Sequence, residues 1–376
     1  MGCEDGVELS PQQWPGTRPT TRPAAQKARS WPIYRGSSAL DGVAPGTLAE
    51  DFELAWSFET GDAILSSPVV ANGIVYFGSS DQSVYAVDVA TGKKVWSFAT
   101  DDIVDAPPLV IDGRVYVGSS DAFFYALDAK SGDLAWKFET GHQIIGGANY
   151  ARLADGSLRI VVGSHDNKLY CFDTGGKKLW DYETGNFVNG APAILGGRAV
   201  FGGCDAILHV VSIKTGQRVN QVELGSDCYV ANAVALADDK VYLGHYGNEF
   251  LCVDLAKSEV VWGYPSTKAF FSSPALAKDR VVFGGRDRQM HCVARSDGKP
   301  IWTFPTRRKI DGSPVICGDK VVFGSGDGRL YIVNLSDGKE VWKYEIGRPI
   351  FSSPAVAGGM ILVGASDNRL YAFRPK

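Results

Sequence analysis

The sequence predicts an all-β fold, an eight-bladed β-propeller built from four-stranded antiparallel blades. Three observations predict it. One unit of about 40 residues recurs eight times, each unit reads as four short strands, and a lone strand near the start of the chain matches the end of a unit. The 44 glycines among 376 residues, with many aromatic and β-branched residues, suit short strands joined by tight turns.

The repeat is marked by the glycine that closes the pattern Val-Tyr-Phe-Gly. This marker glycine stands at Gly78, Gly118, Gly163, Gly202, Gly244, Gly284, Gly324 and Gly364. An Asp follows it by three residues in every unit except the fifth, where Gly247 takes that place. A constant register over so many copies indicates a repeat architecture, and helical repeats are excluded because no 3.6-residue periodicity accompanies it.

The first complete unit contains the four expected strands. They are predicted at residues 67–70, 74–78, 84–88 and 95–98. The turns between them contain Asn72-Gly73, which is a strong hairpin signal, then Asp81, and then Thr91-Gly92. Four antiparallel strands in each of eight units is the composition of a propeller.

A tryptophan ends most units and predicts how the ring closes. It stands at Trp96, Trp136, Trp180, Trp262, Trp302 and Trp342, with Asn220 in the remaining equivalent position. The last unit has no such residue, whereas Trp56 has no strands of its own before it. Residues 52–60 are therefore expected to supply the fourth strand of the last blade and to seal the ring, which removes two exposed sheet edges.

The chain is predicted to have three parts. Residues 1–30 are Pro-rich without periodicity and are expected to form a flexible tether. Residues 31–51 are expected to form an irregular N-terminal cap, and residues 52–376 the propeller. Cys3 is a candidate lipid anchor, as the first residue of a mature bacterial lipoprotein; the alternative is an ordinary free cysteine.

Composition excludes several classes of function. The net charge is −4 and the repeat region has no basic stripe, so nucleic acid is not an expected partner. No C-x-x-C, H-E-x-x-H or G-x-S-x-G motif occurs, so neither a metal nor a catalytic residue is predicted. His209 and His291 replace the repeat Tyr, and packing on the strand face is favoured for them over metal binding.

The turn before each tryptophan carries the resemblance to a known family. Residues 86–96 match A-x-D-x-x-T-G-x-x-x-W, and residues 126–136 match it with Ser131 in place of Thr. This motif resembles the repeat of the quinoprotein β-propellers, the pyrroloquinoline quinone (PQQ) type, over about residues 52–376. In that family the tryptophan docks one blade on the next, which implies a structural role for Trp56, Trp96, Trp136, Trp180, Trp262, Trp302 and Trp342. In architecture the chain is most similar to the outer-membrane β-barrel assembly lipoproteins.

The resemblance implies two kinds of function. Quinoprotein enzymes hold PQQ with two adjacent cysteines and bind calcium, but this chain has no adjacent cysteines, so neither group is expected. The leading hypothesis is a non-catalytic scaffold of the bacterial cell envelope, on the periplasmic side, that binds other envelope proteins. The alternatives are a PQQ-type dehydrogenase or other small-ligand enzyme, and a binding module for carbohydrate or cell-wall polymer.

Charged turn residues suggest a partner-binding surface. Seven cations are expected on one face of the sixth to eighth blades: Lys268, Arg286, Arg288, Arg307, Arg308, Lys309 and Arg348. Acidic residues are expected on the same face of the first two blades: Asp62, Asp81, Asp101, Asp102, Asp105 and Asp121. Such a lopsided face suits an acidic protein segment or an anionic ligand. The alternative is a set of ordinary solvated turns.

A second candidate site is the mouth of the central channel. The inner strands and the segments before them carry polar and aromatic residues that could line a small pocket there. These are Asn149, Asn189, Asn232, Tyr229, Phe270 and Phe271. The alternative is a water-filled channel without a ligand.

Overall fold

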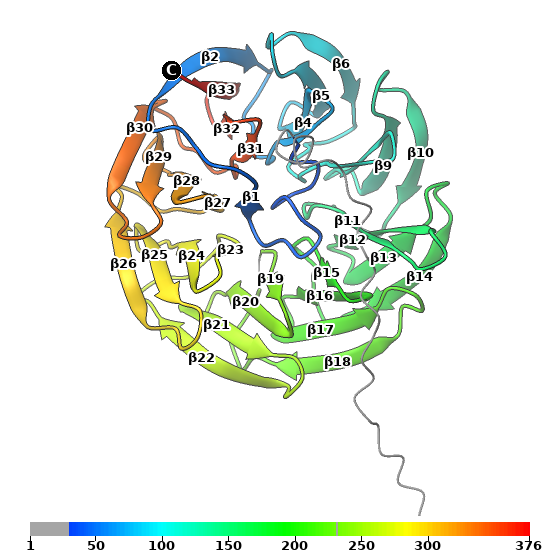
Figure 1. The fold of residues 1–376 in the computed structure, drawn as a ribbon. Helices are drawn as coiled ribbons and strands as arrows, with labels where there is room; N and C mark the ends of the chain where they lie inside the picture. The colour runs from blue at the N-terminus through cyan, green and yellow to red at the C-terminus, as the bar shows by residue number, and fades with distance from the viewer. Residues whose placement is uncertain (1–29, 231) are drawn as a thin grey trace, which may run out of the picture.

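Each repeat unit forms one sheet, and the eight sheets stand around a common axis as the blades of a propeller (Figure 1). The computed structural model describes residues 30–230 and 232–376. All regular elements in these ranges are strands, and none of the described residues forms a helix that could cross a membrane. The predicted fold class is confirmed.

Blades 1 to 4 follow the chain in order from the innermost to the outermost strand. Blade 1 contains β3 (Val69–Ala71), β4 (Ile74–Ser79), β5 (Ser83–Asp88) and β6 (Lys94–Ala99); blade 2 contains β7 (Leu109–Ile111), β8 (Arg114–Gly118), β9 (Phe123–Asp128) and β10 (Leu134–Glu139). Blade 3 contains β11 (Asn149–Arg152), β12 (Leu158–Ser164), β13 (Lys168–Phe172) and β14 (Lys178–Glu183); blade 4 contains β15 (Ala193–Leu195), β16 (Arg198–Gly202), β17 (Ile207–Ser212) and β18 (Arg218–Glu223).

Blades 5 to 8 repeat this order, and the last two also take strands from the N-terminal part of the chain. Blade 5 contains β19 (Ala235–Ala237), β20 (Lys240–Gly244), β21 (Glu249–Asp254) and β22 (Glu259–Pro265); blade 6 contains β23 (Ala275–Leu276), β24 (Arg280–Gly284), β25 (Gln289–Ala294) and β26 (Pro300–Pro305). Blade 7 contains β27 (Val315–Cys317), β28 (Lys320–Gly324), β29 (Arg329–Asn334) and β30 (Glu340–Glu345), with β1 (Val43–Ala44) added inside β27; blade 8 contains β31 (Ala355–Ala357), β32 (Met360–Ala365), β33 (Arg369–Pro375) and β2 (Phe52–Glu59).

The ring is closed by β2, which is the outermost strand of blade 8. It pairs antiparallel with β33, and Trp56 lies opposite Ala372. The predicted closure by residues 52–60 is therefore confirmed. The first and last strands of the propeller share one sheet, so the chain cannot open at this blade without breaking that pairing.

The marker glycine is required by the packing of neighbouring blades. A Cβ atom on Gly78 would lie 2.2 Å from the carbonyl oxygen of Val104, in the segment that leads into blade 2. The equivalent atom on Gly118 would lie 2.1 Å from Ile144, and the one on Gly364 would lie 2.3 Å from Ile64. The repeated glycine is therefore the point where the next blade packs directly on the backbone.

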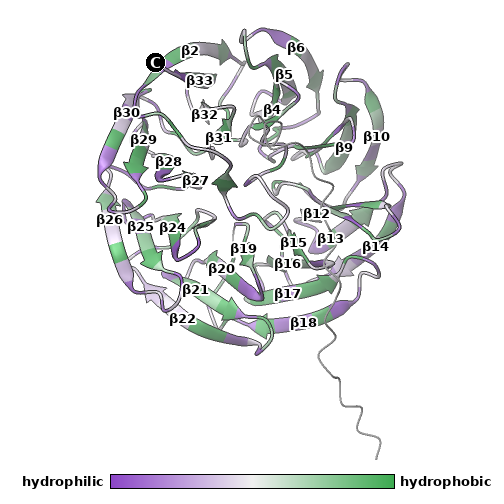
Figure 2. Ribbon diagram, in the orientation of Figure 1, coloured by the Kyte–Doolittle hydropathy of each residue, from purple (hydrophilic) through white to green (hydrophobic). Residues whose placement is uncertain are grey.

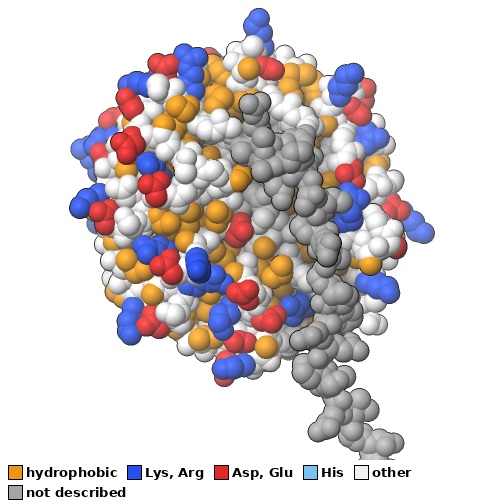
Figure 3. All heavy atoms as spheres, viewed as in Figure 1, with side chains coloured by type: hydrophobic (Ala, Val, Ile, Leu, Met, Phe, Trp, Pro, Cys, Tyr) orange, Lys and Arg blue, Asp and Glu red, His pale blue; other side chains and the backbone are white. Residues whose placement is uncertain are grey.

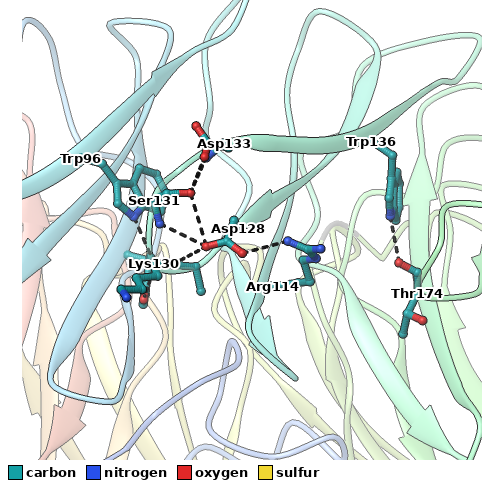
Figure 4. A network of polar contacts seen from close by, with 10 residues as sticks. Trp96, Arg114, Asp128, Lys130, Ser131, Asp133, Trp136 and Thr174 are labelled. Carbon is teal, nitrogen blue, oxygen red and sulfur yellow. Dashed lines mark hydrogen bonds and ion pairs between the residues drawn. The ribbon is translucent and has the colours of Figure 1, made fainter.

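The tryptophans connect each blade to the next at the rim. The indole N–H of Trp96 donates to the carbonyl oxygen of Ala129 (3.1 Å), and that of Trp136 donates to Thr174 (3.0 Å) (Figure 4). The accepting turn is held by its own Asp: Asp128 accepts hydrogen bonds from the backbone N–H groups of Lys130 and Ser131 (Figure 4). Each such contact combines aromatic burial with a directed hydrogen bond.

Two blades depart from this tryptophan contact. Asn220 keeps the hydrogen bond, because its side-chain amide donates to the carbonyl oxygen of Leu255 at 3.0 Å. Trp342 faces blade 8, in which no turn joins the third strand, β33, to the fourth strand, β2. There it packs edge-on against Phe52, with ring centroids 5.6 Å apart. Phe52, at the start of β2, therefore takes the place of that turn as the partner of the tryptophan.

The segment before β2 follows the innermost strands around the ring. Backbone N–H groups of blades 2, 4, 5, 6 and 7 donate in turn to carbonyl oxygens of residues 32–42, and Trp31 pairs with Val70 of blade 1. Trp31, Ile33 and Leu40 are buried. Residues 31–51, predicted to form an irregular N-terminal cap, thus run along the centre of the ring (Figure 1). Residues 1–29, including Cys3, lie outside the described part of the chain.

The core lies between the blades. Clusters of buried apolar residues combine side chains from adjacent sheets. Figure 2 shows hydrophobic residues along the strands, while the outermost strands alternate hydrophobic and hydrophilic residues. The strand β26 shows this with its alternation of exposed and buried positions. The rim therefore faces solvent on one side of each outermost strand.

Candidate functional site

The candidate site lies on one face of the ring, which we call the connection face. It contains the connections between blades and the turn between the second and third strands of each blade. The residue two positions after the marker glycine donates its backbone N–H to a carbonyl in the preceding connection. The donors are Ser80, Ser120, His165, Cys204, Tyr246, Arg286, Gly326 and Ser366, and the acceptors are Ala63, Ile103, Gln143, Phe187, Tyr229, Ala269, Lys309 and Pro349. One donor and one acceptor from every blade thus lie side by side on this face.

The donor position separates two halves of the connection face. In blades 1, 2 and 8 it is serine, and in blade 7 it is glycine. In blades 3 to 6 it carries His165, Cys204, Tyr246 and Arg286. The backbone contact itself requires no particular side chain, because serine and glycine satisfy it equally. Of these four residues only Arg286 was predicted from the sequence; the other three are found by reading the residue two places after the marker glycine.

A pocket of about 490 Å³ lies on the connection face across blades 6, 7 and 8. Its lining is Arg286, Arg288, Arg307, Arg308, Lys309, Gly326, Pro349 and Phe351. Five of the seven predicted partner-binding cations therefore surround one cavity, although they come from two separate segments of the chain. Lys268 and Arg348 do not line it. We call this cavity the basic pocket.

Two cations of the basic pocket are fixed by one carboxylate. The guanidinium of Arg286 makes two hydrogen bonds to Asp311, at 2.9 and 3.1 Å, and the ammonium of Lys309 also pairs with Asp311. Each cation also covers an aromatic ring: Arg286 lies 3.4 Å from the ring centroid of Phe271, and Lys309 lies 4.9 Å from that of Phe351. These paired contacts hold the side chains of Arg286 and Lys309 in a defined geometry.

The other three cations of the pocket have free side chains. Arg288, Arg307 and Arg308 are exposed, and none has a side-chain hydrogen bond or ion pair within residues 30–230 and 232–376. Arg307 is held through its backbone, whose N–H donates to Asp327 at 3.0 Å. By contrast, nearby Arg329 is paired with Glu345 at 2.8 Å. The pocket therefore presents three arginines that are available to an anion.

The face visible in Figure 3 has a different distribution of charge. Lys and Arg side chains lie there beside Asp and Glu around the rim. Ion pairs join the turns of neighbouring blades there, such as Arg198 with Asp239 (2.9 Å) and Arg295 with Asp238 (3.1 Å). Such pairs between exposed groups contribute little stability and leave little net potential. The uncompensated cations described above are all on the connection face.

Comparison with known proteins identifies the fold family. The family model described as the β-propeller of the beta-alanine-activating enzyme matches residues 101–350. The chain belongs to this propeller family. A second model, described as outer membrane protein assembly factor BamB, matches residues 47–153. The repeats are thus of the PQQ-like type, close to those of BamB, as the sequence resemblance indicated.

Solved structures of this propeller type have the same fold at low sequence identity. BamB from Moraxella catarrhalis is 18% identical with a TM-score of 0.72, over 87% of this chain and 98% of its own. Quinohemoprotein alcohol dehydrogenase from Comamonas testosteroni is 14% identical with a TM-score of 0.77, over 94% and 82%. The computationally designed protein Ika8 is 17% identical with a TM-score of 0.76, over 86% and 100%. No curated protein matches in sequence. These likenesses establish the fold alone, so the function must be argued from the site.

In this member of the propeller family the repeated aspartates are structural. Asp81 accepts the backbone N–H of Gly61 and the hydroxyl of Tyr85, both at 2.7 Å, and Asp121 makes the equivalent contacts. Asp105 differs, because burial raises the pKa of its carboxyl, which the Ser80 hydroxyl partly opposes. Some of the acidic residues predicted on this face therefore accept hydrogen bonds within the protein and are less available to a partner.

The residues predicted at the channel mouth separate into two groups. Asn149 is fully buried, and its amide donates to the carbonyl oxygens of Ser38 and Pro192, both at 2.8 Å. Phe270 is buried between blades 5 and 6. Neither lines an open mouth, because the segment 31–51 and the blade packing enclose them; the prediction is wrong for these two residues.

The other four channel-mouth candidates are at least partly accessible on the connection face. Tyr229 is 41% exposed, and Asn189, Asn232 and Phe271 are partly buried. Asn189 donates its amide to the sulfur of Cys204 at 3.0 Å. Burial raises the pKa of the Cys204 thiol, so this cysteine is neutral near pH 7 and is a poor nucleophile.

Histidines that replace repeat residues take over the hydrogen bonds of those residues. His209 lies 2.9 Å from Asp205, and His291 lies 3.1 Å from Asp287, where other blades have a Tyr–Asp pair. In blade 5 both members of that pair are missing. There His245 accepts the backbone N–H of Gly247, and its other ring nitrogen lies 3.7 Å from the Cys228 sulfur. Among the described residues no group of three or more His, Cys, Asp or Glu is placed to hold a metal ion.

Proposed function

We propose that this protein is a non-catalytic scaffold of the bacterial cell envelope that binds an acidic segment of another protein in the basic pocket. The observation that carries the proposal is the set of exposed, unpaired arginines, Arg288, Arg307 and Arg308, around one cavity. The envelope location and the class of partner are supported by the match to the assembly factor BamB.

The chemistry of the pocket favours carboxylates. Arginine presents a rigid fork of N–H donors that matches a carboxylate with two parallel hydrogen bonds. Three such forks can bind carboxylates of a ligand, whereas Arg286 and Lys309 are already paired with Asp311. Cations clustered on one sector also raise the rate of encounter with an acidic partner.

The proposal is tested with a defined anionic probe. We expect a fluorescein-labelled peptide of six glutamates separated by glycines to bind the full chain, as measured by fluorescence anisotropy at 20 and 200 mM NaCl. Replacing Arg307, Arg308 and Lys309 with Ser should weaken binding by about 10- to 100-fold at the lower salt, because charge-assisted hydrogen bonds are lost. The affinity of the unaltered chain should fall with salt more steeply than that of the variant.

The matched control removes the same charge from the opposite face. Lys93, Lys177 and Lys214 are exposed in turns between the third and fourth strands, and Ser at all three should leave probe binding within about twofold. Equal loss in the two triple variants would mean that only net charge matters. That result, or an unchanged affinity in the pocket variant, would contradict the proposal.

A quinoprotein-type dehydrogenase is the second candidate, favoured by the fold likeness to quinohemoprotein alcohol dehydrogenase. The residues of this chain do not fit PQQ. Tyr34 extends toward the centre of the propeller, where its hydroxyl lies 3.0 Å from the hydroxyl of Ser313 in blade 7. The sequence also has no adjacent cysteines. We therefore propose binding in preference to quinone chemistry. Sustained reduction of a dye acceptor by ethanol, after addition of PQQ and calcium, would overturn this preference.

A further inference from the structure

A row of exposed aromatic side chains extends from the basic pocket along the connection face. The most exposed aromatic residues in the described part of the chain are Tyr246 (47%), Phe187 (42%) and Tyr229 (41%). All three belong to the donor and acceptor positions of blades 4 and 5. The remaining exposed large apolar residues are aliphatic and lie on the outermost strands instead.

Tyr246 of the aromatic row is joined to the basic pocket by direct contacts. Tyr246 lies against Phe271, with ring centroids 4.4 Å apart, and Phe271 is covered by Arg286 at 3.4 Å. Arg286 then pairs with Asp311, which also pairs with Lys309 above Phe351. A continuous series of contacts therefore leads from blade 5 through blades 6 and 7 to blade 8.

The fold does not require these aromatic residues. At the position of Tyr246, blades 1, 2 and 8 have serine, and the backbone hydrogen bond to the preceding connection forms there as well. At the position of Tyr229 and Phe187, other blades have Ala63, Ala269 and Pro349. Large aromatic rings at positions that serine and alanine satisfy, and that remain over a third exposed, are typical of binding surfaces and not of packing.

We infer that the aromatic row and the basic pocket form one docking surface for a single extended protein segment, with apolar or aromatic side chains over blades 4 and 5 and carboxylates over blades 6 to 8. This inference rests on the proposed function and adds the second half of the ligand. Charge complementarity selects the acidic end, because three unpaired arginines face the pocket. Tyrosine and arginine, with tryptophan, are enriched among the residues that contribute most binding energy at protein interfaces.

The test compares two labelled peptides that differ only in their apolar half. The first contains Phe-Gly-Phe-Gly-Phe followed by the glutamate-glycine probe described above, and the second has Ser in place of each Phe. We expect the first peptide to bind the full chain at least 10-fold more tightly. In the double variant Tyr229→Ser, Tyr246→Ser this advantage should fall to less than threefold, while the second peptide should bind as it does to the unaltered chain.

Controls separate this inference from the proposed function and from loss of folding. Val95→Ser with Val219→Ser removes exposed apolar groups from the outermost strands, and the advantage of the first peptide should persist. Equal affinity of the two peptides for the full chain would overturn the inference and leave the proposed function standing. Failure of both peptides to bind would overturn both. A polygalacturonate probe that binds through Tyr229 and Tyr246 more tightly than the first peptide would assign the surface to an acidic polysaccharide and overturn the inference.

Discussion

The contact between blades 4 and 5 gives a sharp test of how the blades dock. In six other contacts a tryptophan lies against a glycine with positive φ, such as Trp56 on Gly92 (φ 70°). A Cβ atom on that glycine would lie 2.7 Å from the indole. Between blades 4 and 5 both residues differ: Asn220 replaces the tryptophan, and Ser258, at φ 57°, replaces the glycine. The two side chains hydrogen-bond at 2.9 Å.

We predict that these two positions are strongly coupled. Asn220→Trp alone should destabilise the protein by about 1–3 kcal/mol, because the indole would overlap the Cβ atom of Ser258. Ser258→Gly alone should change stability by less than about 1 kcal/mol, because relief of a strained φ offsets one lost exposed hydrogen bond. The double variant restores the contact of the other blades and should be at least as stable as the unaltered chain. The coupling energy is expected to be about 2–3 kcal/mol.

The measurement is urea denaturation followed by far-ultraviolet circular dichroism, with the four proteins of the cycle compared at one temperature. The preceding contact provides the mirror-image control: Gly216→Ser should destabilise the protein while Trp180 is present and should be tolerated after Trp180→Asn. Additive effects within about 0.5 kcal/mol in both cycles would refute the argument that steric fit between this pair sets the docking contact.

Three further predictions follow from the structure. A chain that begins at Gly61 lacks β2, including buried Phe52 and half-buried Trp56, and so loses about 5 kcal/mol of apolar burial. Its melting temperature should fall by at least about 10 °C relative to a chain that begins at Glu50. Equal melting temperatures would contradict closure by β2. Asp311→Asn removes the ion pairs of Arg286 and Lys309, so both cations become available to the ligand. Binding of the glutamate probe should tighten by about 10-fold at low salt in the anisotropy assay. Unchanged or weaker binding would show that Asp311 does not compete with the ligand. Burial raises the pKa of the Cys171 and Cys292 thiols to about 12, so both should resist a thiol reagent at pH 8 until urea unfolds the protein. Mass spectrometry of the labelled peptides measures this. Rapid labelling of the native protein would contradict their burial.

The site could be predicted from the sequence only in part. The basic character of the sixth to eighth blades was evident from Arg307-Arg308-Lys309 and from Arg286 and Arg288, because turn residues keep their place in every repeat. The sequence did not indicate that these residues surround one cavity or that Asp311 fixes two of them. The aromatic row was also missed, except for Tyr229, because its members alternate between two kinds of loop.

What the sequence determined by itself is the ring: the number of blades, their four strands, and closure by the segment around Trp56. These follow from repeated local requirements, such as a marker glycine where the next blade touches the backbone and a tryptophan that needs a turn beneath it. Only the tertiary structure decided which cations remain unpaired, which inner residues are covered by the segment from Trp31 to Leu48, and why Asn149 and Phe270 are closed to solvent. Those outcomes depend on contacts between neighbouring blades and on contacts of residues 31–51 with the innermost strands of several blades. No pattern within a single repeat encodes such contacts.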